Sequence, residues 1–335
     1  MSLFSKDLGI DLGTIYTRVV SGGQVVLEEP TVAAIVVAEQ KMVEWGKAAH
    51  EMYGRVPEAI EVTRPMLNGV IADYEVTEYI LADVLKKAGG MVRLFRPTVM
   101  VTVPKGVTSV ERRAVHEAAL QAGSREAYLI EQPLAAAIGI DLPIGTPTGN
   151  MILCLGGGTT QAAVLAMYGI VAGETLRAGG LHMDEAIVSY VRKKYGLIIG
   201  QPTAEHVKIT IGAAVPIDEE RSIEIQGQDQ VTGLPRPITL TTEEIIDALG
   251  EPLKAVVETT RRTLERTPPE LVSDIIDRGV AMCGGGALLR GLDRLLTKEL
   301  GVPAYLVDNP TTCVAEGAAR GLTMYSLIRR SLPTG

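Results

Sequence analysis

The stretch Gly9-Ile10-Asp11-Leu12-Gly13-Thr14 decides the fold class, because the chain repeats its pattern. An apolar run, Leu8 to Asp11, ends in a carboxylate and is followed by the pair Gly13-Thr14. A second β-rich stretch then runs from Thr17 to Val20. The second copy starts with Met151 to Leu155, continues as Gly156-Gly157-Gly158-Thr159-Thr160, and ends in an apolar strand over 162–168. Each copy predicts a hairpin with a tight turn, and the pair predicts an internally duplicated chain.

The two copies differ in one chemical respect. Ile10-Asp11-Leu12-Gly13 aligns with Leu153-Cys154-Leu155-Gly156, so an aspartate in one copy matches a thiol in the other. Glycines beside threonines let backbone N–H groups approach phosphate oxygens, and the hydroxyls add further donors. Taken singly, such a turn is more often only a tight turn. Two of them facing each other predict a clamp for a polyphosphate.

A third glycine cluster follows a predicted strand over 279–282. It reads Cys283-Gly284-Gly285-Gly286-Ala287-Leu288 and is expected to precede a helix running from Leu289. A bare backbone of this kind is suited to lie flat against a base or a sugar.

Strands alternating with helices in both halves predict an α/β fold. Helices are expected over 114–122, opened by Ser109 to Arg113, and over 245–264, opened by Thr242 to Glu244. Thr267-Pro268-Pro269-Glu270 should end one helix and start another. The stretch Glu131 to Gly139 predicts a small-residue helix that packs closely on a related helix and acts as a hinge.

The organisation expected from these patterns is two lobes, each with a small inserted subdomain. The first lobe core takes residues 1–30, 65–140 and 309–335, with 31–64 as its subdomain; the second takes 141–180 and 240–308, with 181–239 as its subdomain. A length of 335 residues also favours two lobes over one core.

Composition excludes several classes of function. A net charge of −8 and 4% aromatic residues argue against nucleic acid as a partner. Three scattered cysteines predict neither a disulfide framework nor a metal knuckle, and the four histidines lack metal-ligand spacing. Neither a bilayer-spanning apolar run nor an export signal is apparent, so we expect a reducing cytoplasm.

Taken together, these motifs resemble the actin, heat-shock chaperone and sugar-kinase superfamily, and within it the MreB/Mbl family of bacterial actin-like cell-shape proteins. The resemblance covers nearly the whole chain. It also rests on Arg64-Pro65 with Gly69 to Asp73, on Glu111 to Ala114, on Pro268 to Leu271 and on Gly284 to Leu289. It implies an actin-like ATPase fold of two duplicated lobes, each a mixed sheet flanked by helices, with small inserted subdomains.

The resemblance also implies a site for ATP or ADP with Mg²⁺. Phosphate contacts would come from Asp11, Gly13, Thr14, Ile15, Tyr16, Gly156, Gly157, Gly158 and Thr159, with Asp11 on the metal side and Gln132 and Thr159 as catalytic residues. Nucleoside contacts would come from Gly285, Gly286, Ala287, Leu288 and the stretch Glu205-His206-Val207-Lys208. The alternative for Glu205 and Lys208 is an ordinary surface ion pair on one helix.

Four positions depart from the family pattern by lacking its usual acid: Cys154, Gln132, Gln161 and Leu181. A hard cation prefers a carboxylate or water oxygen to a neutral thiol. An amide orients water but is a weak base. We therefore expect nucleotide binding with slow or absent hydrolysis, so that any ATPase activity is weakened by Cys154.

The resemblance further implies filaments on the cytoplasmic, inner face of the cell membrane, with a role in rod shape and in placing cell-wall synthesis. Self-association and the membrane surface are thus the expected partners, with cell-wall synthesis or cell-shape membrane proteins beside them. Met91, Val92, Leu94 and Phe95 alternate with arginines in a loop that predicts membrane contact. The alternative is that Leu94 and Phe95 cap the adjacent core.

The alternative function is a chaperone-type or small-molecule-kinase ATPase of the same superfamily. A chaperone would need a substrate-binding domain after the ATPase. A sugar kinase would need a catalytic aspartate in a sugar pocket, which the sequence does not reveal.

Overall fold

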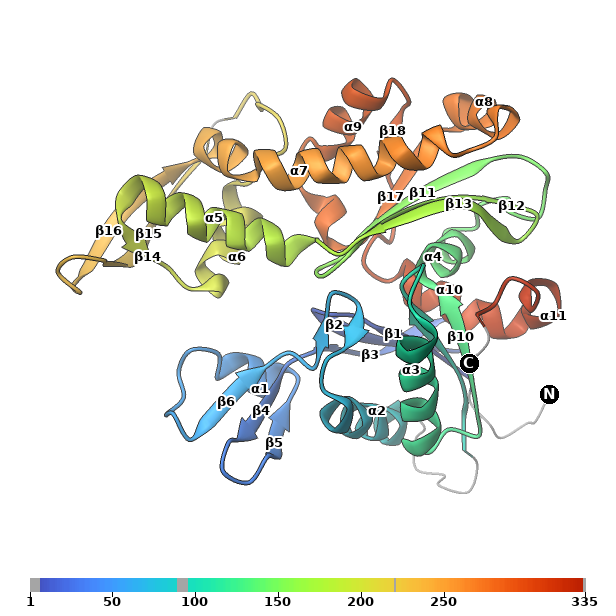
Figure 1. The fold of residues 1–335 in the computed structure, drawn as a ribbon, viewed down its shortest axis with the longest axis horizontal. Helices are drawn as coiled ribbons and strands as arrows, with labels where there is room; N and C mark the ends of the chain where they lie inside the picture. The colour runs from blue at the N-terminus through green and yellow to red at the C-terminus, as the bar shows by residue number, and fades with distance from the viewer. Residues whose placement is uncertain (1–6, 89–95, 220, 334–335) are drawn as a thin grey trace.

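The computed structural model describes residues 7–88, 96–219 and 221–333. Within them, two five-stranded sheets repeat one strand order, β3-β2-β1-β9-β10 and β13-β12-β11-β17-β18 (Figure 1). In each sheet the first three strands pair antiparallel and the last three pair parallel. The predicted duplication is confirmed. The strands are β1 (Leu8–Leu12), β2 (Tyr16–Ser21), β3 (Gln24–Pro30), β9 (Thr98–Val103), β10 (Glu126–Glu131), β11 (Asn150–Leu155), β12 (Thr160–Ala166), β13 (Gly169–Leu176), β17 (Val280–Cys283) and β18 (Ala304–Leu306).

The central strands are apolar because both of their faces are covered. Every residue of β1, β9, β11 and β12 is buried, as expected for strands that carry helices on both sides. The covering helices are α2 (Tyr74–Ala88), α3 (Ser109–Gln121), α4 (Gln132–Gly139), α5 (Gly180–Tyr195), α7 (Thr242–Glu265), α8 (Pro269–Arg278), α9 (Leu292–Leu300), α10 (Cys313–Thr323) and α11 (Tyr325–Ile328).

The predicted helix signals are confirmed with small shifts. Thr108 and Thr241 cap α3 and α7, each in a reciprocal capping box with the glutamate three residues later. After the third glycine cluster the expectation was wrong: Gly285–Leu288 form a 3₁₀ turn, η1, and the helix begins at Leu292. Leu289 is extended and Gly291 is left-handed at φ 72°, which delays the start of the helix.

Two three-stranded sheets lie at the same end of the molecule, one in each lobe, on the left of Figure 1. One joins β5 (Lys41–Trp45), β4 (Ala33–Val36) and β6 (Ile60–Thr63) beside α1 (Lys47–Glu51). The other joins β14 (Leu197–Ile198), β15 (Ser222–Asp229) and β16 (Pro235–Thr241) beside α6 (Gln201–Ile211), and a short ribbon pairs β7 (Met66–Leu67) with β8 (Val70–Ile71). The exact boundaries of lobes and subdomains stay a prediction.

Helices α4 and α10 lie between the two large sheets and pack against each other (Figure 1). Their backbones nearly touch. A Cβ added to Gly139 would overlap the carbonyl oxygen of Cys313, and one added to Gly317 would overlap that of Ala135. The close helix packing predicted from small residues is confirmed, and glycine is required on both sides of the contact.

This helix pair shares one core with inward-facing residues of both sheets, among them Met100 and Ile130 of the first and Ile152 and Cys154 of the second. The opposite faces pack separately, against α2 and α3 in one lobe and against α5, α7 and α9 in the other. The strand ends that carry the two glycine turns are thus held on rigid sheets that meet at α4 and α10.

Candidate functional site

A cavity of about 420 Å³ lies between the two lobes, where the duplicated turns face each other. Both turns close with the same backbone hydrogen bond. Gly13 N donates to Tyr16 O at 3.1 Å, and Gly156 N donates to Thr159 O at 2.8 Å. Most of the residues predicted for a nucleotide line this cavity: Asp11, Gly13, Thr14, Ile15, Tyr16, Gln132, Gly156, Gly157, Gly158, Thr159, Glu205, Lys208, Gly285, Gly286 and Leu288.

The two turns touch, and glycine is what permits it. A Cβ on Gly157 would overlap the side chain of Ile15, and a Cβ on Gly158 would lie 2.5 Å from Thr14 Oγ1. Gly69 N also donates to Thr14 Oγ1 at 3.1 Å. Peptide groups of both lobes are therefore brought to one side of the cavity, as binding a chain of phosphates would require.

Asp11 lies at the end of β1 and is 8% exposed. Thr102 Oγ1 donates to its Oδ1 at 2.7 Å, and Gln132 Nε2 donates to the same atom at 3.4 Å. Burial raises the pKa of this carboxyl, while the hydrogen bond from Thr102, the positive charge of Arg18 and the hydrogen bond from Gln132 oppose that shift. A cation arriving with the phosphates would stabilise the ionised form.

Gln132 begins α4, directly after β10, and its side chain contacts the second lobe. Gln161 Nε2 donates to Gln132 Oε1 and also to Thr159 Oγ1, the latter at 3.3 Å. The two predicted catalytic residues, Gln132 and Thr159, are thus linked by one amide.

Three residues predicted for the nucleoside do not line the cavity. His206 is exposed, Val207 is fully buried in the core, and Ala287 is 4% exposed. On a helix, residues i and i+3 share a face and those between them do not, so Glu205 and Lys208 reach the cavity while their neighbours point elsewhere.

Lys208 has a partner that the sequence did not suggest. Its Nζ lies 2.6 Å from Asp184 Oδ1 and donates to Gly180 O at 2.9 Å. Asp184 is 1% exposed, and burial raises the pKa of its carboxyl against the charge of Lys208. This ion pair joins α6 to the start of α5. Lys208 therefore does more than form a surface ion pair with Glu205 on its own helix. One feature of the sequence could have pointed to this partner: Asp184 is the first acid after the glycine pair Gly179-Gly180, where α5 begins.

The three cysteines, scattered in the sequence, come together at the cavity, which Cys154 lines. Cys154 and Cys283 are register partners on β11 and β17, with their Sγ atoms 3.3 Å apart. The hydrogen bond with Cys154 and burial raise the pKa of the Cys283 thiol, and the hydrogen bond with Cys283 and burial raise the pKa of Cys313. These neutral thiols are poor ligands for a hard cation.

The site suits Mg²⁺ only together with phosphates. Among the described residues, no group of three or more His, Cys, Asp or Glu side chains could hold a metal ion. Magnesium commonly binds proteins through one or two carboxylates, keeps several waters and takes the rest of its ligands from substrate phosphates. Asp11 fits that arrangement as the single carboxylate at the phosphate end.

The membrane prediction falls on a part of the chain that the structure does not describe. Met91, Val92, Leu94 and Phe95 all lie outside the described residues. Within those residues, no helix combines the length and the apolar character that crossing a bilayer demands.

Two duplicated lobes with matching strand order and opposed glycine turns over one cavity define the actin-like fold. A solved structure, MreB5 of Spiroplasma citri bound to ADP, is similar with a TM-score of 0.91 and 34% identity, covering 96% of this chain and 97% of that chain. A MamK double helical filament is similar in fold, with a TM-score of 0.81, 22% identity, and coverage of 95% and 99%.

A family model described as MreB/Mbl protein matches residues 5–330. Cell shape-determining protein MreB of Escherichia coli K12 is 47% identical over 332 residues, covering 97% of this chain and 95% of that protein. The chain therefore belongs to the MreB/Mbl family.

Proposed function

We propose that the cavity binds ATP and ADP, with the phosphates between the two glycine turns and the nucleoside against Gly285, Gly286, Leu288 and the Glu205–Lys208 face of α6. One observation carries this proposal: two turns with the same backbone hydrogen bond meet over a single cavity. Support also comes from the similar MreB5 structure of Spiroplasma citri, which is bound to ADP.

Mg²⁺ would enter with the phosphates, with Asp11 as the protein carboxylate on its side of the site. Bound there, the ion would offset phosphate charge. Thr102 and Gln132 orient the Asp11 carboxylate. Cys154 occupies the equivalent position near the end of β11. Its thiol gives the second turn no charge that could help Asp11 bind the cation.

Hydrolysis is expected to be slow. Gln132 replaces the stronger base of the family pattern, and an amide can orient a water molecule but accepts its proton poorly. Fewer acids near the site also mean less repulsion of a triphosphate. Affinity for the nucleotide is therefore expected to persist while turnover falls.

The polymer role follows from family membership. Relatives are named cell shape-determining proteins, and we assign this chain a cytoskeletal role in rod shape and in the placement of cell-wall synthesis. It would form filaments through head-to-tail contacts that propagate without closing. Filaments would gather on the inner membrane surface, where many copies of one weak anchor add up to firm attachment.

Calorimetry with ATP and with ADP, each with Mg²⁺, tests the nucleotide site. Uptake of one nucleotide per chain is expected, and no uptake at millimolar concentration would remove the assignment. Sedimentation with ATP then tests the polymer, since a pellet is expected from a filament subunit and none from a chaperone-type ATPase. Co-sedimentation with anionic liposomes, comparing the wild type with Phe95→Ser, tests the membrane role.

A further inference from the structure

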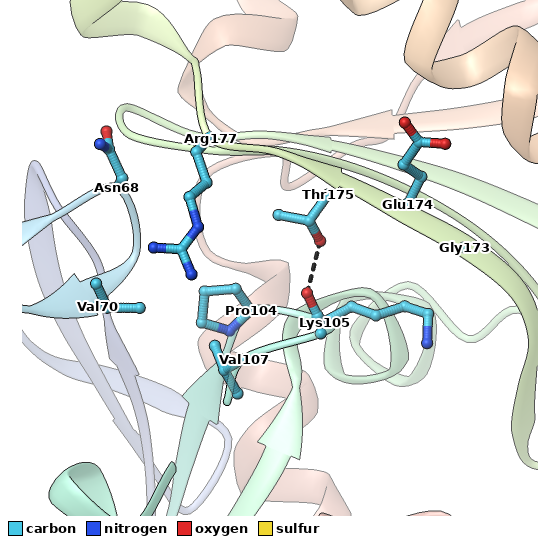
Figure 2. A pocket seen from close by; sticks show the side chains of 10 residues that line it. Asn68, Val70, Pro104, Lys105, Val107, Gly173, Glu174, Thr175 and Arg177 are labelled. Atoms are coloured by element: carbon cyan, nitrogen blue, oxygen red, sulfur yellow. Dashed lines mark hydrogen bonds between the residues drawn. The ribbon is translucent and has the colours of Figure 1, made fainter. Parts of the chain in front are cut away.

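Both backbone polar atoms of Lys105 are held by the opposite lobe. Lys105 follows β9 of the first sheet, whereas Gln161 and Thr175 are register partners on β12 and β13 of the second. Lys105 N donates to Gln161 Oε1 at 2.8 Å. Thr175 Oγ1 donates to Lys105 O at 2.7 Å, the hydrogen bond drawn in Figure 2. These three residues, here termed the Lys105 clasp, join the lobes beside a second cavity of about 300 Å³.

The clasp continues into the first cavity through two side-chain amides. Gln161 is 1% exposed, and its Nε2 donates to Gln132 Oε1. Gln132 Nε2 in turn donates to Asp11 Oδ1 at 3.4 Å. A chain of hydrogen bonds thus runs from the backbone of Lys105 through Gln161 and Gln132 to Asp11.

The chemistry at its two ends fixes the direction of this chain. A backbone N–H can only donate, so Gln161 must turn its oxygen toward Lys105 and its NH₂ toward Gln132. An ionised carboxylate can only accept, so Gln132 must turn its NH₂ toward Asp11. The oxygen of Gln132 is then left to face Gln161.

This direction matters because Oε1 is the one acceptor atom of the Gln132 side chain. A water molecule oriented by Gln132 for attack on a phosphate has to donate to that atom. The hydrogen bond from Gln161 occupies one lone pair and fixes where the other points. We infer that Gln161 is a positioning residue that restrains Gln132, ties its orientation to the contact between the lobes, and slows hydrolysis. The inference rests on the nucleotide-binding function proposed above.

Removing the donor to Gln132 tests the restraint. In Gln161→Glu, one carboxylate oxygen still accepts from Lys105 N, but the other cannot donate to Gln132 Oε1. The NH₂ of Gln132 stays on Asp11, while its oxygen loses its donor and becomes free to accept from water. Phosphate release in a single turnover is expected to rise about tenfold, or ~1.4 kcal/mol in activation free energy, while the Kd for ADP stays within about twofold.

Two variants separate positioning from loosening of the lobes. Thr175→Val breaks the other half of the Lys105 clasp without touching Gln132, so its hydrolysis rate is expected to match the wild type. Gln161→Met removes the donor to Gln132 and should also accelerate phosphate release, which keeps the test open if Gln161→Glu does not fold.

Three results would overturn the inference. Rates in Gln161→Glu and Gln161→Met at or below the wild type, with ADP binding intact, would mean that Gln161 does not restrain Gln132. An equal acceleration in Thr175→Val would assign the effect to lobe contact alone. Failure of the wild type to bind nucleotide would remove the proposed function, and with it the inference.

Discussion

The turn between β1 and β2 has the same backbone hydrogen bond as the turn between β11 and β12. The two turns differ in charge. Both close with the hydrogen bond described above, yet the next-to-last residue of the preceding strand is Asp11 in one case and Cys154 in the other. Asp11 is oriented by Thr102 and Gln132, whereas Cys154 lies against a second thiol. The turn geometry therefore does not depend on the acid, and shape and charge can be altered separately.

The largest effect is expected from changing shape. In Gly158→Val the new side chain would lie against Thr14 Oγ1 at 2.5 Å and Asn68 Cα at 3.1 Å, so the two turns must separate. Closing the turns again around the phosphates would bring back this overlap at a cost of roughly 3 kcal/mol, which predicts about a hundredfold weaker ADP binding by calorimetry. Gly250→Ala, at a position where a Cβ would meet nothing within 4 Å, is the control and should bind like the wild type. Equal affinities in both variants would show that the turns need not touch.

An intermediate effect is expected from changing charge. Cys154→Asp would make the two turns alike, but it places a second carboxylate at a position that is 6% exposed and touches Cys283. Its desolvation should lower the free energy of unfolding by about 2 kcal/mol. Adding Mg²⁺ and ADP together should restore part of this lost stability. A rise in the melting temperature would show the recovery.

The matched control for that change is Cys154→Ser, which has similar volume and no charge. It should gain no more from Mg²⁺ than the wild type does, because Asp11 supplies the carboxylate for the cation in both chains. If Cys154→Asp gains no more from Mg²⁺ than Cys154→Ser, then the end of β11 does not face the cation and the resemblance between the turns is one of backbone alone.

The smallest effect is expected outside both turns, at η1. A Cβ on Gly285 would meet no atom within 4 Å, yet this residue lines the cavity. Gly285→Ala should therefore leave the melting temperature nearly unchanged and weaken ADP binding only a few-fold, by about 0.5–1 kcal/mol. A loss as large as that of Gly158→Val would instead place the phosphates at η1.

The local features of the site could be predicted from the sequence because each is determined by a short, continuous stretch of residues. The glycine–threonine turns and the capping boxes of α3 and α7 each need only a few consecutive residues. The duplication emerged from comparing two such stretches. The small residues of α4 likewise sufficed to predict its close contact with another helix.

The remainder depends on pairing between distant segments. Cys154 and Cys283 meet because β11 and β17 are parallel partners in one register, which composition and spacing do not specify. The amide contact between Gln132 and Gln161 spans both lobes. His206 and Val207 belong to the same short motif as Glu205 and Lys208, but helical periodicity places them on other faces of α6, away from the cavity.

At Gly139 against Cys313 and at Gly317 against Ala135, α4 and α10 meet backbone to backbone, with no Cβ of either glycine between them. A pivot at these two contacts would let one half of the molecule turn while its centre stays in place. The displacement would then grow with distance from this axis, reaching its greatest extent at the outlying hairpins β4–β5 and β15–β16. A small rotation at the α4–α10 contact would thus produce a large displacement of these hairpins.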